Sequence, residues 1–157
     1  MNSPLPFIDS LHRTDLPGVW AIEQTLVGPW TYGQLQGELT VGHGWQLVAK
    51  TDVGQVCGYL FGSTVLDEAE IRKLAVAADH RRQGIGQHLL TAACRRLGRQ
   101  QISRCFLELR AANTPALALY LKNDFQIVGR RKNYYTRPTE DAILLQKLLN
   151  QDKENGL

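Results

Sequence analysis

The sequence predicts an α/β fold in which a mixed, mostly antiparallel sheet with a central parallel βαβ unit is flanked by helices. Three observations support this fold class. Two apolar runs, 45–50 and 55–66, are separated by the turn-like segment TDVG, a pattern typical of an antiparallel hairpin. A strand, a helix and a second strand follow over residues 68–111, a succession that makes its two strands parallel. Further strand-like runs come near the end of the chain, after one more helix.

The N-terminal part is expected to hold a short strand and two helices. Residues 6–12 predict the strand. A helix is expected over 15–26, because Asp15 suits its N-cap and Pro17 its first turn. Residues 28–39 predict a second, weaker helix before the hairpin.

The βαβ unit follows the hairpin. Its first strand is expected over 68–77, its helix runs from Gly84 to about Arg99, and its second strand covers 103–111. The helix shows apolar positions at helical spacing, which predicts one buried face.

The next predicted helix spans 113–124. Asn113 or Thr114 can cap it, Pro115 suits its first position, and Asn123 is expected to take the left-handed conformation at its end. Residues in this region therefore carry both a start and a stop signal for a helix.

The last strands are expected over 125–131 and 142–149, followed by a frayed tail. At 157 residues the chain fits one domain, which we place at 1–150 with a short tail at 151–157. A chain of this length buries enough surface to fold without a metal or a disulfide.

Cysteine use and the chain start indicate a cytoplasmic protein. The three cysteines are far apart in the sequence and form no CxxC pair, which favours a reducing compartment. The N-terminal residues lack the basic and apolar regions of a signal peptide. The longest mostly apolar run, 56–66, is too short to span a membrane.

Charge is distributed unevenly along the chain. Residues 1–71 hold two basic and eight acidic side chains, a net charge of −6. Residues 72–137 hold fourteen basic and three acidic side chains, a net charge of +11. Such a basic segment indicates a polyanionic partner, either nucleic acid or a phosphate-rich cofactor, unless it is only a solvated basic surface.

A glycine-rich turn lies in this basic segment, with the sequence RRQGIG at 81–86. Glycine lets the backbone approach a ligand, and the first amides of the following helix point outward, so the turn is suited to a phosphate. It lacks the Lys-Ser/Thr pair of a P-loop, and Leu89 stands where a dinucleotide fingerprint has its third glycine. A simple loop-to-helix turn remains the alternative.

With its flanks, the stretch IRKLAVAADHRRQGIGQHLL resembles the acyl-CoA signature of the GNAT superfamily of N-acyltransferases, with Arg81, Gly84 and Gly86 at the motif positions. The resemblance implies a GNAT-like domain that uses acetyl-CoA as co-substrate and needs no metal. It implies that the strand residues Leu74, Ala75 and Val76 bind the acetyl and pantetheine portion through their main chain. It also assigns the pyrophosphate and its surroundings to the motif residues Arg81, Arg82, Gln83, Gly84, Ile85, Gly86 and Gln87.

The resemblance narrows to the ribosomal-protein alanine N-acetyltransferase family, through LELRAANTPALALY and RRKNYY in the same order. That family acetylates the N-terminal alanine of ribosomal small-subunit protein eighteen. The implied partners are therefore a protein N-terminus, that of a ribosomal protein, and coenzyme A, with no direct nucleic acid and no membrane.

Glu108 is the candidate base. Strand alternation places Cys105, Leu107 and Leu109 on one face and Glu108 on the other. A partly buried carboxylate is a better proton acceptor than one in water, although a strand acid can also simply face solvent. The resemblance places the family's proton acceptor on Glu108, acting directly or through a water.

Tyr120 and Asn113 belong to the helix after that strand. A phenol can protonate a leaving thiolate, and the resemblance places the family's proton donor on Tyr120. By spacing alone Tyr120 reads as a core residue. Asn113 can be only an N-cap, but the resemblance adds a coenzyme A contact.

The acceptor wall is assigned to three aromatic residues. The resemblance places RRKNYY beside the peptide groove, so Tyr134 and Tyr135 are candidate substrate-binding residues, and Trp30 can belong to the same wall. Surface tyrosines on a basic turn and a core tryptophan are the alternatives. The four histidines show no metal-ligand spacing, and no metal site is predicted.

Two positions depart from the family's pattern. Arg72 and Lys73 precede the cofactor strand where apolar or small residues are expected, so a charge that faced the acceptor would favour an acidic peptide. The segment KNDF replaces the usual glycine before phenylalanine, and Asn123 is expected to supply the same geometry.

Two other functions stay open on the sequence. The same scaffold can acetylate a lysine side chain or a small-molecule amine, since a fold does not decide its substrate. A non-enzymatic nucleic-acid-binding module is the more distant alternative, and the basic residues lack the interleaved aromatics of an RNA-binding sheet.

Overall fold

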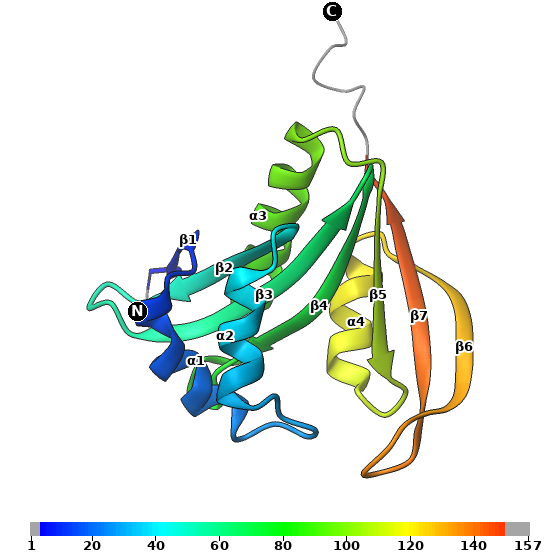
Figure 1. The fold of residues 1–157 in the computed structure, drawn as a ribbon, viewed down its shortest axis with the longest axis horizontal. Coiled ribbons are helices and arrows are strands. Elements are labelled where there is room, and N and C mark those ends of the chain that lie inside the picture. Colours follow the sequence, from blue (N-terminus) through cyan, green and yellow to red (C-terminus); the bar gives the residue numbers. More distant parts are fainter. Residues whose placement is uncertain (1–3, 150–157) are drawn as a thin grey trace, which may run out of the picture. The chain divides into compact units, whose positions relative to one another are not determined.

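The computed structural model describes residues 4–149, and these residues form two compact units. Among the described residues, the first unit comprises 4–63 together with Lys73–Ala93, and the second comprises Thr64–Arg72 together with 94–149. Seven strands are hydrogen-bonded in the order β1-β2-β3-β4-β5-β7-β6 (Figure 1). The predicted tail at 151–157 lies outside the described residues.

The first unit holds the N-terminal strands and helices. Its elements, with β3, β4 and α3 given at their full bounds, are β1 (Phe7–Ser10), α1 (Leu16–Glu23), α2 (Tyr32–Thr40), β2 (Gly44–Lys50), β3 (Val56–Val65), β4 (Glu68–Val76) and α3 (Ile85–Arg99). A 3-10 turn precedes α1 and another precedes α3. Each predicted element of this region is present.

The strands β1, β2 and β3 of the first unit are antiparallel. β1 pairs with β2 from Phe7↔Lys50 to Ser10↔Leu47. β2 pairs with β3 from Gly44↔Ser63 onward, with an irregularity at Ala49/Lys50. The predicted hairpin is therefore confirmed.

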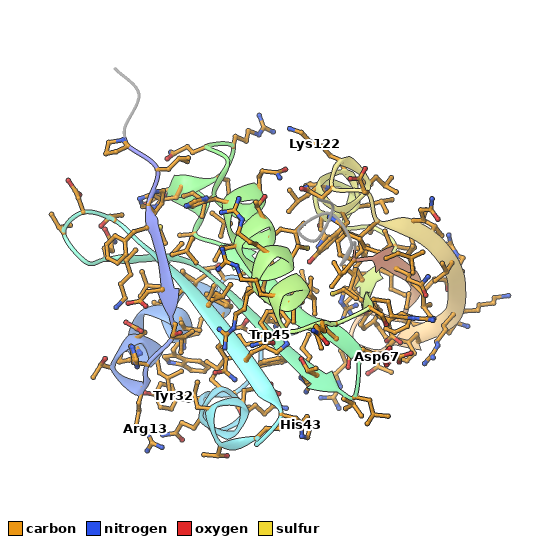
Figure 2. The ribbon with its side chains drawn as sticks, turned by 90° about the horizontal axis from the view of Figure 1, so that it is seen from above. Arg13, Tyr32, His43, Trp45, Asp67 and Lys122 are labelled. Atoms are coloured by element: carbon orange, nitrogen blue, oxygen red, sulfur yellow. The ribbon has the colours of Figure 1, made fainter. Side chains whose placement is uncertain are left out.

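Helices α1 and α2 lie on one face of β2 and β3 (Figure 1). Leu16, Val19 and Leu35 are fully buried in this core, together with Tyr59 and Phe61 of β3. Tyr32 begins α2 (labelled in Figure 2), and its ring packs edge to face on Trp20 of α1 at 5.9 Å. The apolar faces of both helices are thus buried on the sheet, which is the main source of their stability.

The start of α1 differs from the prediction in one detail. Asp15 is at the N-cap, but its carboxylate makes no hydrogen bond to the helix. It instead accepts from the backbone N–H of His12 at 2.8 Å and pairs with Lys50 at 2.7 Å. An ion pair with β2 has replaced the expected local cap.

Helix α3 approaches β3 closely at Gly58. A Cβ atom at this position would lie 3.1 Å from Leu89 Cδ1 and 3.2 Å from Ile85 Cγ2. Glycine here lets the start of the helix pack directly on the strand, and both leucine and isoleucine are buried.

The second unit holds the later strands. Its own elements are β5 (Arg104–Arg110), α4 (Thr114–Lys122), β6 (Gln126–Tyr135) and β7 (Glu140–Leu148). β4 and β5 pair in parallel from Glu68↔Arg104 to Ile71↔Leu107, which confirms the predicted βαβ unit. β7 pairs antiparallel with β5 and with β6. In the turn before β4, Asp67 (labelled in Figure 2) accepts a hydrogen bond from the hydroxyl of Ser103 at 2.8 Å.

The end of α4 corrects the prediction for Asn123. Asn123 has φ −103°, and the left-handed residue is Asp124, with φ +68°. Phe125 N–H donates to the carbonyl of Tyr120 at 3.1 Å, and Asp124 N–H donates to that of Leu121 at 3.3 Å. These two bonds form a Schellman motif, which requires its left-handed residue one position after the C-cap. The helix ends at the exposed Lys122 (Figure 2).

No helix within residues 4–149 combines the length and the apolar character needed to cross a membrane.

Candidate active site

The predicted cofactor residues of the first unit form one continuous segment from the end of β4 to the first turn of α3. Leu74, Ala75 and Val76 end the strand, and Ala77 N–H donates to the carbonyl of Cys57 on β3 at 2.8 Å. Arg81 turns back, and its Nε donates to the carbonyl of Val76 at 3.1 Å. The turn is therefore tied to the strand that precedes it.

Two residues of this turn have a left-handed backbone conformation. Arg82 and Gly84 have φ of +62° and +82°. The first helical bond of α3 runs from His88 N–H to the carbonyl of Gly84 at 2.9 Å, so the amides of Ile85 and Gly86 precede it and point out of the helix end. Left-handed residues alternating with right-handed ones gather N–H groups into a concave site, and the helix dipole favours an anion there.

Gly84 is required by conformation and not by space. A Cβ atom at this position would meet no other atom within 4 Å. The positive φ alone selects glycine here, because a side chain is strained in that region.

A buried carboxylate ties the loop before α2 to β4. Glu23, the last residue of α1, has no exposed surface. Its Oε1 accepts from the hydroxyl of Tyr59 at 2.8 Å, and its Oε2 accepts from Trp30 N–H at 2.8 Å and from Lys73 Nζ at 3.0 Å. Burial, then the charge of Glu23 and the hydrogen bond to it, raises the pKa of Tyr59 well above its usual range. This phenol is therefore a hydrogen-bond donor at any physiological pH.

Trp30 lies in this cluster. Its ring packs edge to face on Phe61 at 5.6 Å, and the ammonium of Lys73 lies 4.7 Å from the ring centroid. The side chain of Lys73 is 15% exposed and pairs with Glu23, so its charge is already compensated within the first unit. This pairing removes Lys73 as a reason to expect an acidic acceptor.

In the second unit, Glu108 lies on the less buried face of β5. Cys105, Leu107 and Leu109 are buried on the other face, as the alternation predicted. The Glu108 side chain is 27% exposed, and its Oε1 lies 3.5 Å from Nη1 of Arg131. The hydroxyl of Tyr134 donates a hydrogen bond to Glu108, and this bond together with the carboxylate charge raises the pKa of Tyr134.

Tyr134 and Tyr135 lie beside this carboxylate. Their rings pack edge to face at 5.1 Å, and the guanidinium of Arg110 lies over the ring of Tyr135, 4.5 Å from its centroid. Burial, followed by the charge of Glu108, raises the pKa of Tyr135 to about 12. The structure thus brings together the candidate base and two candidate substrate-binding residues.

Arg110 holds the turn between β6 and β7 in place. Its guanidinium donates to the carbonyls of Pro138 at 3.1 Å and Thr136 at 3.4 Å, and it pairs with Glu140 at 3.4 Å. Glu140 also accepts a hydrogen bond from Ala112 N–H in the loop before α4. The position of the two tyrosines beside β5 is therefore fixed by charged and backbone contacts.

Tyr120 is buried, with 5% of its surface exposed, and its ring packs on Phe125 at 5.3 Å. Its pKa is raised above the usual range by burial and by the neighbouring thiols of Cys105 and Cys94. Cys105 lies on the face of β5 opposite to Glu108. The candidate acid and the candidate base are therefore associated with different faces of one strand.

Asn113 is the N-cap of α4, as predicted. Its Oδ1 accepts from Ala116 N–H at 3.3 Å. Pro115 follows in the first turn of the helix. The local role is confirmed, and the coenzyme A contact stays a prediction.

Two residues of these clusters were not identified from the sequence as site residues. Glu23 had a signal, because it falls four residues after Val19 and seven after Leu16 on the buried face of a helix, where a charge requires a partner. Arg131 had none, because alternation does not show which of two adjacent arginines meets Glu108.

No grouping of three or more metal-ligating side chains is found among residues 4–149. A cavity of about 390 Å³ in the second unit is lined by residues outside the candidate site, namely Cys94, Gly98, Asp124, Lys147, Leu148 and Leu149.

Comparisons with known proteins show the family of this chain. The model of the acetyltransferase (GNAT) family matches residues 5–125. The chain is 38% identical over 144 residues to the ribosomal protein bS18-alanine N-acetyltransferase of Escherichia coli (strain K12), which covers 88% of this chain and 94% of that protein. A protein from Bacillus subtilis (strain 168), named as a putative enzyme of the same kind, is 32% identical over 92% of this chain and 96% of its own length.

A solved structure shows the same fold. The crystal structure of the ribosomal-protein-S18-alanine N-acetyltransferase from Escherichia coli superposes with a TM-score of 0.85 at 32% identity, over 96% of this chain and 98% of that one. The predicted mixed sheet with a parallel βαβ unit is therefore confirmed as a fold that these enzymes share.

Proposed function

Because the chain belongs to the GNAT acetyltransferase family, we propose that it acetylates the α-amino group of an N-terminal alanine, that of ribosomal protein bS18. The observation that carries the proposal is the 38% identity to an enzyme of that name over nearly the whole of both chains. The cluster of Glu108, Tyr134 and Tyr135 supplies a carboxylate and two phenols suited to an amine acceptor.

Acetyl-CoA is the co-substrate of this enzyme family. We assign its pyrophosphate to the backbone amides that follow Arg82, at the positive end of α3. The exposed guanidinium of Arg82 adds positive charge for the cofactor phosphates. The main chain of Leu74–Val76 is assigned to the pantetheine and acetyl portion, where an N–H can stabilise the developing oxyanion.

Glu108 is assigned as the base. The acceptor enters as an ammonium and leaves as an amide, so it gives up two protons, of which the thiolate of coenzyme A takes one and solvent receives the other. A free α-amino group has a pKa of about 7.7–8.0, against about 10.4 for lysine, so an N-terminal acceptor is easier to deprotonate. Glu108 accepts the first proton, directly or through a water.

Tyr120 is assigned as the proton donor to the leaving thiolate. Its raised pKa means that the buried phenol holds its proton at neutral pH. Asn113, at the start of the same helix, is assigned a contact with coenzyme A.

Trp30, Tyr134 and Tyr135 are assigned to the acceptor groove. Rigid aromatic side chains provide contact area at a low entropic cost, and phenols can hydrogen-bond a peptide main chain. For such an acceptor we propose a cytoplasmic enzyme, and we propose that it binds neither nucleic acid nor a membrane directly.

Mass spectrometry of one peptide tests the proposal. The peptide begins with the alanine terminus of bS18 and contains one internal lysine, and it is incubated with the enzyme and acetyl-CoA. We expect acetylation of the α-amino group alone, and none of a matched peptide whose terminus is blocked. Acetylation of the lysine, or of a small amine only, would assign the chain to another acceptor class.

A further inference from the structure

Arg131 on β6 is the charged residue at the candidate base that the proposed chemistry leaves unexplained. Its Nη1 lies 3.5 Å from Oε1 of Glu108. A base that accepts a proton from an ammonium must come close to that ammonium. In the complex, the cation beside Glu108 is therefore expected to be the acceptor's own ammonium group. The guanidinium therefore lies beside the carboxylate oxygen Oε1, a position that an ammonium pairing directly with this oxygen would need.

The contact between Arg131 and Glu108 is loose compared with that of the neighbouring arginine. Arg130 Nε lies 2.8 Å from Oδ2 of Asp141, and the other oxygen of this carboxylate accepts from Asn133 N–H at 2.9 Å. The Arg131 side chain is 55% exposed, and its nitrogen is at the long end of ion-pair distances. A pair between partly exposed groups at this distance is weak. The guanidinium also lies 5.4 Å from the ring centroid of Tyr134, an exposed contact that contributes about 0.5–1 kcal/mol, so both of these contacts can be given up at a modest cost.

The other polar groups around Glu108 do not replace this cation. Tyr134 donates a hydrogen bond to Glu108, which lets the carboxylate keep one partner when Arg131 moves. The groups acting on Glu108 or on its two phenol neighbours are Arg131, Tyr134 and Tyr135 from β6, Arg110 from β5, Glu140 from β7 and Glu70 from β4. Of the two cations in this set, Arg110 is bound to the β6–β7 turn and to Glu140.

We propose, on the premise that Glu108 is the base, that Arg131 occupies the cation position at Glu108 in the free enzyme and yields it to the ammonium of the acceptor. Arg131 is then a positioning residue. It pairs with the carboxylate before the substrate arrives, and its displacement is part of the cost of acceptor binding. A neutral acceptor cannot make this exchange, so the arrangement selects for a protonated amine.

Steady-state kinetics of Arg131→Gln test the proposal, with Arg130→Gln as the matched control. On the pH plateau we expect Arg131→Gln to lower KM for the alanine peptide roughly 2- to 5-fold, the range that corresponds to a partly exposed ion pair, with kcat within about twofold. The acid limb of its kcat/KM profile moves to higher pH, because the carboxylate has lost a neighbouring cation. Arg130→Gln leaves both quantities unchanged.

A second readout does not depend on turnover. In protein labelled with ¹³C at the glutamate side-chain carboxyls, the titration midpoint of Glu108 rises in Arg131→Gln and not in Arg130→Gln. If the wild type acetylates no α-amine, the proposed function fails, and this titration still tests the contact between Arg131 and Glu108.

Three outcomes would overturn the inference. A KM that rises in Arg131→Gln would show that the guanidinium binds the substrate. An unchanged KM and an unchanged midpoint would show that it does nothing at the base. Equal shifts in both variants would indicate a general effect of surface charge.

Discussion

The carboxylate of Glu23 and the ammonium of Lys73 lie 3.0 Å apart, with the Glu23 side chain fully buried and that of Lys73 15% exposed. The same carboxylate accepts from Tyr59 and from the backbone of Trp30, so its three hydrogen bonds join it to β3, to β4 and to the loop before α2 within the first unit. A buried charge of this kind is tolerated only with such partners.

Replacing Glu23 by Gln is expected to lower the free energy of unfolding by about 3 kcal/mol, because the ammonium of Lys73 would lose its partner. The double variant Glu23→Gln, Lys73→Met is expected to recover part of this loss. Urea unfolding of both single variants and the double variant gives the coupling energy. A coupling near zero would mean that the ion pair contributes nothing to folding.

Unfolding at alkaline pH is expected to report on Tyr59. Its pKa in the folded protein is raised, so above about pH 10 the unfolded chain loses this proton while the folded protein keeps it. The contribution of Tyr59 to the free energy of unfolding is therefore fully present below about pH 10, and it is lost as the pH rises further. In urea unfolding between pH 9 and 11, Tyr59→Phe should lose less stability than the wild type, and an identical decline in both would contradict the assignment.

The end of α4 predicts a stabilising substitution. Asp124 has φ +68°, a region that glycine adopts at no cost, so Asp124→Gly is expected to stabilise the protein by about 0.5–1 kcal/mol. The comparison variant is Asn123→Gly, at φ −103°, where glycine adds freedom to the unfolded chain and removes the hydrogen bond that Asn123 Nδ2 donates to the carbonyl of Leu119 at 2.8 Å, so it should destabilise. Thermal unfolding distinguishes the two, and the reverse order would contradict the observed position of the left-handed residue.

Cofactor binding is expected to depend on the conformation of Gly84. Gly84→Ala should weaken the binding of acetyl-CoA by up to about fivefold, because the turn of the free variant can relax and must regain φ +82° on binding, at a cost of about 1 kcal/mol. Gly98→Ala is the control, because its Cβ also meets no atom within 4 Å and alanine favours a helix interior. Calorimetric titration with acetyl-CoA measures the affinity of both variants. Equal affinities would contradict the assignment of this turn to cofactor binding.

The two assigned catalytic residues are expected to act on turnover. Glu108→Gln and Tyr120→Phe should each lower kcat by about 10²-fold, within the usual range for general acid–base groups, and leave the affinity for acetyl-CoA nearly unchanged. Stopped assays with the alanine peptide and binding titrations measure the two quantities. Full activity in either variant removes that residue from the mechanism.

Much of the fold was predictable from local patterns. The hairpin, the βαβ unit and the alternation of β5 rest on apolar periodicity and turn residues, which act over a few residues and can be read without tertiary contacts. The Asn113 cap is equally local. Asp15 and Asn123 show the limit of such patterns. The carboxylate of Asp15 pairs with Lys50 of β2, and the bonds from Asp124 and Phe125 move the left-handed position by one residue.

By itself the sequence determined the elements, the order in which they come and the glycine turn with its helix, because each depends on neighbours in the chain. Only the tertiary structure decided which charges meet. Glu23 and Lys73 are 50 residues apart, and Arg131 reaches Glu108 only because β6 and β5 both pair with β7. Electrostatic partners depend on distance in space and on shielding from water, and neither quantity is written in the spacing of residues along the chain.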